Sequence, residues 1–63
     1  MIVKGKISAI YEARKTAEII LTEFHNAVTA ELPFYRGNIT DRAVGDDVII
    51  AVFGEDFNDA VIL

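Results

Sequence analysis

The sequence predicts an all-β protein, a small barrel of five antiparallel strands. Short segments of alternating apolar and polar residues follow one another along the chain, and this period is typical of strands with one buried face. Turn-forming residues separate the segments, and no window keeps a 3.6-residue period, although residues 10–21 have a helix-forming composition. The 63 residues form one domain, 1–63, with too few strands for a sandwich.

The first two strands are expected at residues 2–12 and 16–24, joined by a short charged connection. Gly5 stands in the middle of the first strand, and a glycine there indicates a bulge or a close approach of another backbone. His25 and Asn26 follow the second strand. Because Asn tolerates a positive φ, we expect a hairpin turn at these two residues.

The third strand, 27–35, has the clearest alternation of the chain. Its expected apolar face consists of Val28, Ala30, Leu32 and Phe34. Pro33 cannot donate a ladder hydrogen bond, so this strand should lie at an edge or end there. Residues 36–43 break the strand pattern and contain glycine and asparagine, which predicts a loop with at most one helical turn.

Residues 48–53 are apolar on both faces, which is typical of a strand covered on both sides. This strand therefore crosses the barrel interior, or its outer face meets another chain. An acidic turn at 54–59 holds Phe57 and leads to a closing strand at 60–63. Five sequential strands with one longer connection predict a closed small barrel of the OB type.

Composition limits the classes of function. The chain contains no cysteine and one histidine, which excludes disulfides, thiolate metal sites and sites with several histidines. The formal net charge is −4, and all of it falls in residues 32–63, so general affinity for nucleic acid is disfavoured. No apolar run approaches the ~18 residues of a membrane helix, and residues 1–8 lack the apolar stretch of a signal peptide.

Three polar groups could form chemical sites, and each is better explained by a turn. Adjacent strand residues such as Asp46 and Asp47 point to opposite faces, so they cannot easily share a substrate. The oxygens of Asp56, Asn58 and Asp59 could bind calcium, but the turn lacks the spacing of an EF-hand. His25 has no recognisable nucleophile motif around it. We therefore expect a protein that is not an enzyme and has no cofactor or metal.

The six aromatic side chains leave one alternative function open. Many OB-fold domains stack single-stranded nucleic acid on such rings. The only basic group, Lys4, Lys6, Arg14 and Lys15, is interleaved with glutamates, which makes nucleic acid an unfavourable ligand. A binding module for single-stranded nucleic acid or for a peptide is therefore the alternative to a structural module.

Small size and high apolar content predict association with another chain. A 63-residue domain is usually marginal in stability, and 52% of this chain is hydrophobic, more than a small barrel can hide. We expect a homo-oligomer that buries the doubly apolar strand, the edge strand and the aromatic residue of the acidic turn. The expected interface residues are Val28, Leu32, Phe34, Val48, Ile49, Ile50, Val52, Phe53 and Phe57.

Three segments of the chain resemble a known family. The opening MIVKGKISAIYEARKTAEIILTEF, the middle VTAELPF and the end VGDDVIIAVFGEDFNDAVIL are similar to the N-terminal OB domain of phage baseplate assembly protein V. That family comprises the central tail-spike proteins of contractile tails and the spike proteins of type VI secretion.

The resemblance implies a non-catalytic collar domain that forms a homotrimer and docks to tail-hub or baseplate proteins. It implies synthesis in the bacterial cytoplasm and a final place in the tail or baseplate of a phage or prophage particle. It assigns no catalytic, cofactor or metal residue to this chain.

Overall fold

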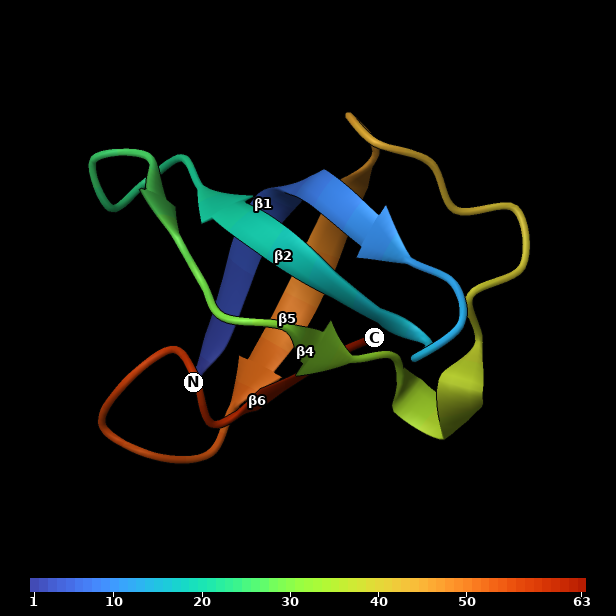
Figure 1. The fold of residues 1–63 in the computed structure, drawn as a ribbon. Coiled ribbons are helices and arrows are strands. Elements are labelled where there is room, and N and C mark those ends of the chain that lie inside the picture. The colour runs from blue at the N-terminus through green and yellow to red at the C-terminus, as the bar shows by residue number, and fades with distance from the viewer.

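One curled antiparallel sheet and one 3₁₀ turn make up the computed structural model, which covers residues 1–63 (Figure 1). The strands are Ile2–Tyr11 (β1), Thr16–Leu21 (β2), Ala27–Val28 (β3), Leu32–Pro33 (β4), Asp47–Val52 (β5) and Ala60–Ile62 (β6); the 3₁₀ turn is Tyr35–Gly37 (η1). Their order is β3-β2-β1-β5-β6. Strand β4 also pairs with β2, at the start of β2, whereas β3 pairs with its end. Because β3 and β4 lie within one predicted strand, the all-β, five-stranded class is confirmed.

The two ends of the sheet approach each other and nearly close a barrel. A single parallel bridge joins Phe34, just after β4, to Ile62 in β6. Figure 1 shows β4 and β6 lying side by side below the crossing pair β2 and β5. A small, partly open barrel of this kind is the OB type of architecture.

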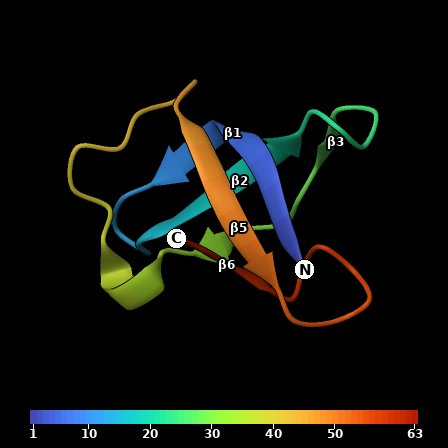
Figure 2. The ribbon, with the colours of Figure 1, turned by 180° about the vertical axis from the view of Figure 1, so that it is seen from behind.

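Strand β1 belongs to both halves of the barrel. Its first half pairs with β5, from Ile2 opposite Ala51 onward, and its second half pairs with β2, ending at Tyr11 opposite Thr16. A β-bulge between Ile7 and Ala9 interrupts the second ladder. Bulges bend a strand and increase its twist, so this one helps β1 pass from one sheet layer to the other (Figure 2).

Gly5 lies where β1 crosses closest to β2. A Cβ at Gly5 would stand 2.5 Å from Cγ2 of Ile19 and 2.7 Å from the backbone oxygen of Ile20. The predicted close backbone approach at this glycine is confirmed. The bulge lies further along the strand.

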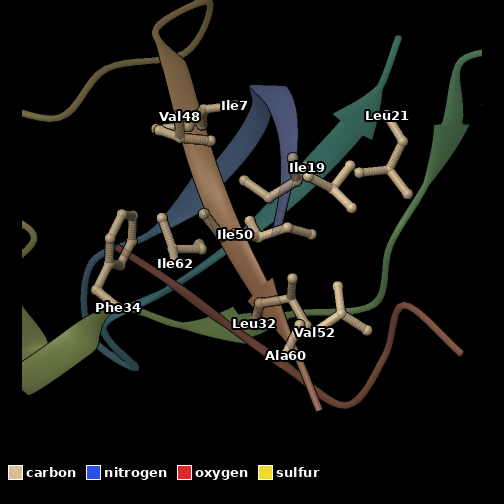
Figure 3. Packing of buried hydrophobic residues seen from close by; sticks show 12 residues of the cluster. Ile7, Ile19, Leu21, Leu32, Phe34, Val48, Ile50, Val52, Ala60 and Ile62 are labelled. Carbon is tan, nitrogen blue, oxygen red and sulfur yellow. The ribbon is translucent and has the colours of Figure 1, made fainter. Parts of the chain in front are cut away.

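The interior of the barrel is entirely apolar apart from one hydroxyl. Figure 3 shows the side chains of β5 and β6 directed toward those of β1, β2 and β4. The core residues are Val3, Ile7, Ala17, Ile19, Leu21, Leu32, Phe34, Val48, Ile50, Val52, Ala60 and Ile62. Every strand except β3 contributes to this cluster, so each of those strands is held by apolar burial.

The predicted third strand is interrupted, and the expected alternation along it is wrong. Ala17 and Ile20 of β2 are three positions apart, whereas their partners Leu32 and Val28 are four positions apart. Because of this extra residue, the side chains before it lie on the opposite face from the one that an uninterrupted alternation would give them. Val28 is therefore exposed and Thr29 is buried, while Leu32 faces the core.

Buried Thr29 is satisfied by the neighbouring backbone. Its hydroxyl accepts the backbone N–H of Ile19 at 3.1 Å and donates to the carbonyl of Ala30 at 2.8 Å. The hydroxyl thus replaces a ladder hydrogen bond at the point where β3 and β4 are interrupted.

The connections follow the sequence patterns. A hairpin joins β2 to β3 as predicted, but its turn covers residues 22–26 and is longer than the two residues expected. His25 and Asn26 close this turn with φ values of 59° and 58°. Residues 36–43 form the predicted loop, which η1 opens with a single turn. None of the helical structure has the length and apolar character that a membrane crossing by helix demands.

Candidate docking surface

The outer side of β5 is apolar and exposed to solvent. Along this strand the inward residues are buried, whereas Ile49 is 49% exposed and Phe53, just past the strand, is 70% exposed. Figure 2 shows β5 and the first half of β1 running side by side across the front of the molecule. On the neighbouring strands, Ile2 is 65% exposed and Leu63 is 47% exposed.

These side chains form continuous rows because strand register places them opposite one another. Ala51 stands between Ile2 of β1 and Val61 of β6. One row further along, Ile49 stands opposite Lys4 and accepts a hydrogen bond from the backbone N–H of Leu63 at 2.9 Å. We call this surface the outer apolar face. It consists of Ile2, Ile49, Ala51, Phe53, Val61 and Leu63.

A hollow of about 600 Å³ opens at the end of this face where β5 begins. It is lined by Lys4, Arg42, Asp47, Val48, Ile49 and Leu63. Arg42 is held there by a hydrogen bond from its guanidinium to the carbonyl of Leu63 at 3.0 Å. Its guanidinium carbon also lies 5.3 Å from the ring centroid of Phe34, a cation–π distance. The hollow is therefore part apolar and part cationic.

The one carboxylate of the hollow is already paired. Asp47 accepts a hydrogen bond from Nζ of Lys6 at 2.8 Å, and this bond holds the pKa of Asp47 below its usual value. Lys4 and Arg42 make no ion pair within the chain. Two cations that form no ion pair with an Asp or Glu side chain therefore stand at this end of the outer apolar face, and Lys4 also helps to lower the pKa of the nearby Asp47.

The opposite end of the face is the acidic turn between β5 and β6. Residues 54–59 include Glu55, Asp56 and Asp59, and none of the three forms an ion pair. Two contacts fix this turn to the body of the barrel. The side chain of Asn58 accepts the backbone N–H of Ala30 at 2.9 Å, and the Phe57 ring packs against Phe24 with a centroid separation of 4.8 Å.

The polar groups considered as chemical sites lie in connections, except Asp47, which is the first residue of β5 and pairs with Lys6. Asp56 accepts the backbone N–H of Asn58 at 2.8 Å, and Asp46 accepts that of Ala43 at 3.0 Å. His25 is exposed in its hairpin turn. Nowhere do three His, Cys, Asp or Glu side chains gather as a metal site would need. The carboxylate oxygens of Asp46 and Asp56 therefore fix the conformation of the neighbouring backbone.

Five of the nine residues predicted at the interface lie in the core, so the prediction that they are surface residues is wrong. Leu32, Phe34, Val48, Ile50 and Val52 are core residues, each no more than 5% exposed. Their apolar character serves the barrel itself, so they have no surface to offer a partner. Ile49, Phe53 and Val28 are exposed, and Phe57 is half-buried against Phe24 and the core. Of these four, Ile49 and Phe53 lie on the outer apolar face.

Sequence reasoning missed Ile2, Val61 and Leu63 as members of this face. Ile2 shares its side of β1 with Lys4 and Lys6, so alternation assigns it to a polar surface. The signal that could have found it is the pairing of β1 with β5. Once Ile2 lies opposite Ala51, its side chain must extend the outer side of β5.

The surface that many OB folds use for oligonucleotides is occupied here by internal ion pairing. That surface comprises the second and third strands and the adjoining turns. Here Arg14 pairs with Glu31 at 2.7 Å and stacks over the ring of Tyr11 at 4.6 Å. The hydrogen bond from Tyr11 to Glu18, 2.6 Å long, raises the pKa of Tyr11. A phosphate approaching this surface would meet carboxylates and a cation that is already paired.

Comparisons with protein-family models, with curated proteins and with solved structures gave no match to this chain. The resemblance to contractile-tail spike proteins therefore stays a prediction, and the geometry of the outer apolar face is the basis for a functional proposal.

Proposed function

We propose that this domain is a non-catalytic assembly module that associates with further copies of itself through the outer apolar face. The observation that supports this is a continuous apolar surface on three strands, formed by side chains that the core does not need. In the setting that the sequence resemblance suggests, the module would be a collar in a contractile tail and would also meet tail-hub proteins.

An interface of ordinary size would cover a moderate share of this small domain. A standard protein interface buries about 800 Å² on each partner. The whole domain exposes 4039 Å², so such an interface would cover about a fifth of its surface. Contiguous exposed apolar surface on a small protein marks an interaction site.

The free energy gained by burying these apolar side chains is too small to hold an interface together without polar contacts. Fully burying an apolar side chain contributes about 1.5–3 kcal/mol, and the four most exposed members of the face are half to two-thirds exposed. Their burial in a partner contributes roughly 4–7 kcal/mol, while association costs about 4–15 kcal/mol in lost freedom. The apolar contacts alone therefore barely offset that cost, and burial on both partners together with polar complementarity must add to them.

The proposal is tested with Ile49→Asp, which puts a charge in the centre of the face without touching the core. We expect the wild-type protein to show a mass well above 7.0 kDa by light scattering as its concentration rises, and the variant to return to that monomer mass. Val44→Asp is the control, because Val44 is 63% exposed in a turn away from the face. Circular dichroism verifies that both variants keep the sheet.

Two results would contradict the proposal. One is a wild-type protein that stays monomeric at millimolar concentration. The other is an oligomer that survives Ile49→Asp unchanged.

A further inference from the structure

The two ends of the outer apolar face carry opposite charge. Lys4 and Arg42 form no ion pair where β5 begins, and the nearby carboxylate, Asp47, is paired with Lys6. Glu55, Asp56 and Asp59 stand without a basic side-chain partner in the turn where β5 ends. The amino group of Met1 lies near this second end, where it donates to the carbonyl of Val52 at 2.9 Å. Figure 2 shows the two loops that bound the face at opposite ends of β5.

The shape of the face is also complementary along β5. Phe53 is the most exposed large apolar side chain of the protein, and it rises at one end. The hollow of about 600 Å³ beside Ile49 and Leu63 lies toward the other end. Ala51, a small side chain, stands midway. Because residues rise about 3.3 Å along a strand, Phe53 and Ile49 lie at equal distances of about 6.6 Å from it.

Phe53 and Ile49, which lines the hollow, exchange places under a two-fold rotation about an axis that passes Ala51, lies in the plane of the interface and runs perpendicular to β5. A two-fold interface brings the same patch of two copies together, so each feature must find its complement within the patch itself. With the axis at Ala51, the Phe53 ring of each copy enters the hollow of the other. The same rotation carries each acidic turn onto the partner's Lys4 and Arg42.

We infer that the partner of the outer apolar face is a second copy of this chain, related by a two-fold axis at Ala51 with the two β5 strands antiparallel. This inference rests on the proposed function and specifies its partner and geometry. It differs from the three-fold arrangement that the sequence resemblance implies. The charged ends supply the polar complementarity that the apolar contacts need, and they supply it twice in each dimer.

The first test uses a thiol crosslink across the axis. The chain has no cysteine, so an Ala51→Cys variant carries a single thiol. A residue on a two-fold axis lies next to its own copy, but packed sheets stand about 10 Å apart, which is wider than a disulfide spans. A short bis-maleimide should therefore be used, and it should convert most of this variant to a covalent dimer of twice 7.0 kDa. Glu55→Cys is the matched control. It lies at the end of the face, far from its own copy, and should remain uncrosslinked under the same treatment.

The second test changes only exposed charges and leaves the core intact. Lys4→Glu and Glu55→Lys should each weaken self-association about tenfold by analytical ultracentrifugation, because each dimer contains the altered pair twice. An equimolar mixture of the two variants should recover wild-type association, since the mixed dimer pairs opposite charges at both ends. Added salt should weaken the wild-type dimer and the mixed dimer alike.

The outcomes separate this inference from the proposed function. An oligomer that depends on Ile49, has three-fold mass, and shows neither the Ala51 crosslink nor rescue in the mixture would overturn the two-fold pairing and leave the assembly role standing. A wild-type monomer at every concentration would overturn both.

Discussion

Gly5 is the position where a single methyl group should cost this domain the most relative to its size. The substitution is Gly5→Ala. Its added Cβ would meet Cγ2 of Ile19 at 2.5 Å and the carbonyl oxygen of Ile20 at 2.7 Å. The first contact involves a buried side chain with no free space, and the second involves backbone fixed in the β1–β2 ladder. Neither neighbour can yield by a simple rotamer change.

Two opposing effects set the magnitude. Alanine removes the entropic cost of a glycine in a strand, a gain of about 0.5–1 kcal/mol. Inserting a carbon into a packed core costs about 1–3 kcal/mol, and backbone contact places this case in the upper part of that range. The net loss is about 1–2 kcal/mol. For a domain of this size, each kcal/mol lowers Tm by about 4–8 °C, so we expect a decrease of about 5–15 °C.

The assay is thermal unfolding followed by circular dichroism, with every protein at one concentration. Gly54→Ala is the matched control. A Cβ at Gly54 would meet only the side chain of Asp59, at 3.0 Å, and that exposed carboxylate can rotate away. We expect its Tm to stay within about 3 °C of wild type. If Gly5→Ala unfolded at or above the wild-type temperature, the close crossing of β1 and β2 would be refuted.

Two further predictions concern hydrogen bonds that the fold uses. Thr29→Val removes the hydroxyl that accepts the N–H of Ile19 and leaves that buried donor unpaired. The free energy of unfolding, measured by urea titration, should fall by about 1–3 kcal/mol. An unchanged midpoint would show that the bond is dispensable. Hydrogen bonds from Arg14 and from a lysine hold the pKa values of Glu31 and Asp47 below their usual range. A lowered folded-state pKa stabilises above the unfolded-state value of about 4, and that stability is lost as pH falls through the folded-state value. Wild-type Tm should therefore decrease below about pH 4, with a smaller decrease in the Glu31→Gln variant, and equal acid sensitivity of the two proteins would contradict this account.

The strand pattern predicted the fold class because alternation is a direct consequence of one-sided burial. It placed β1 and β5 within a residue or two and identified Gly5 as a point of close approach. It failed between Val28 and Leu32. The extra residue there leaves no mark in the sequence, because Val28, Ala30, Leu32 and Phe34 continue an uninterrupted apolar alternation. Only the pairing with β2 reveals that Thr29 is the buried residue.

The candidate surface was predicted only in part, for a related reason. An apolar segment such as 48–53 identifies a strand that is covered on both sides, but it does not say which side the barrel covers. That assignment depends on long-range pairing between β1, β5 and β6, which brings Ile2 and Leu63 beside Ile49 from the two ends of the sequence. Local periodicity contains no information about such pairing.

Under the proposed assembly role, strand β5 divides folding and assembly between alternate residues. Ile50 is completely buried. The free-energy cost of burying a charge there would exceed the roughly 3–9 kcal/mol by which a domain of this length is stable. Its neighbour Ile49 faces solvent, where the isolated barrel gains nothing from an isoleucine. The proposed assembly role gives an apolar residue at this position a contact outside the monomer. Substitutions at the outward residues are for that reason the ones that test assembly, whereas those at the inward residues test only whether the barrel folds.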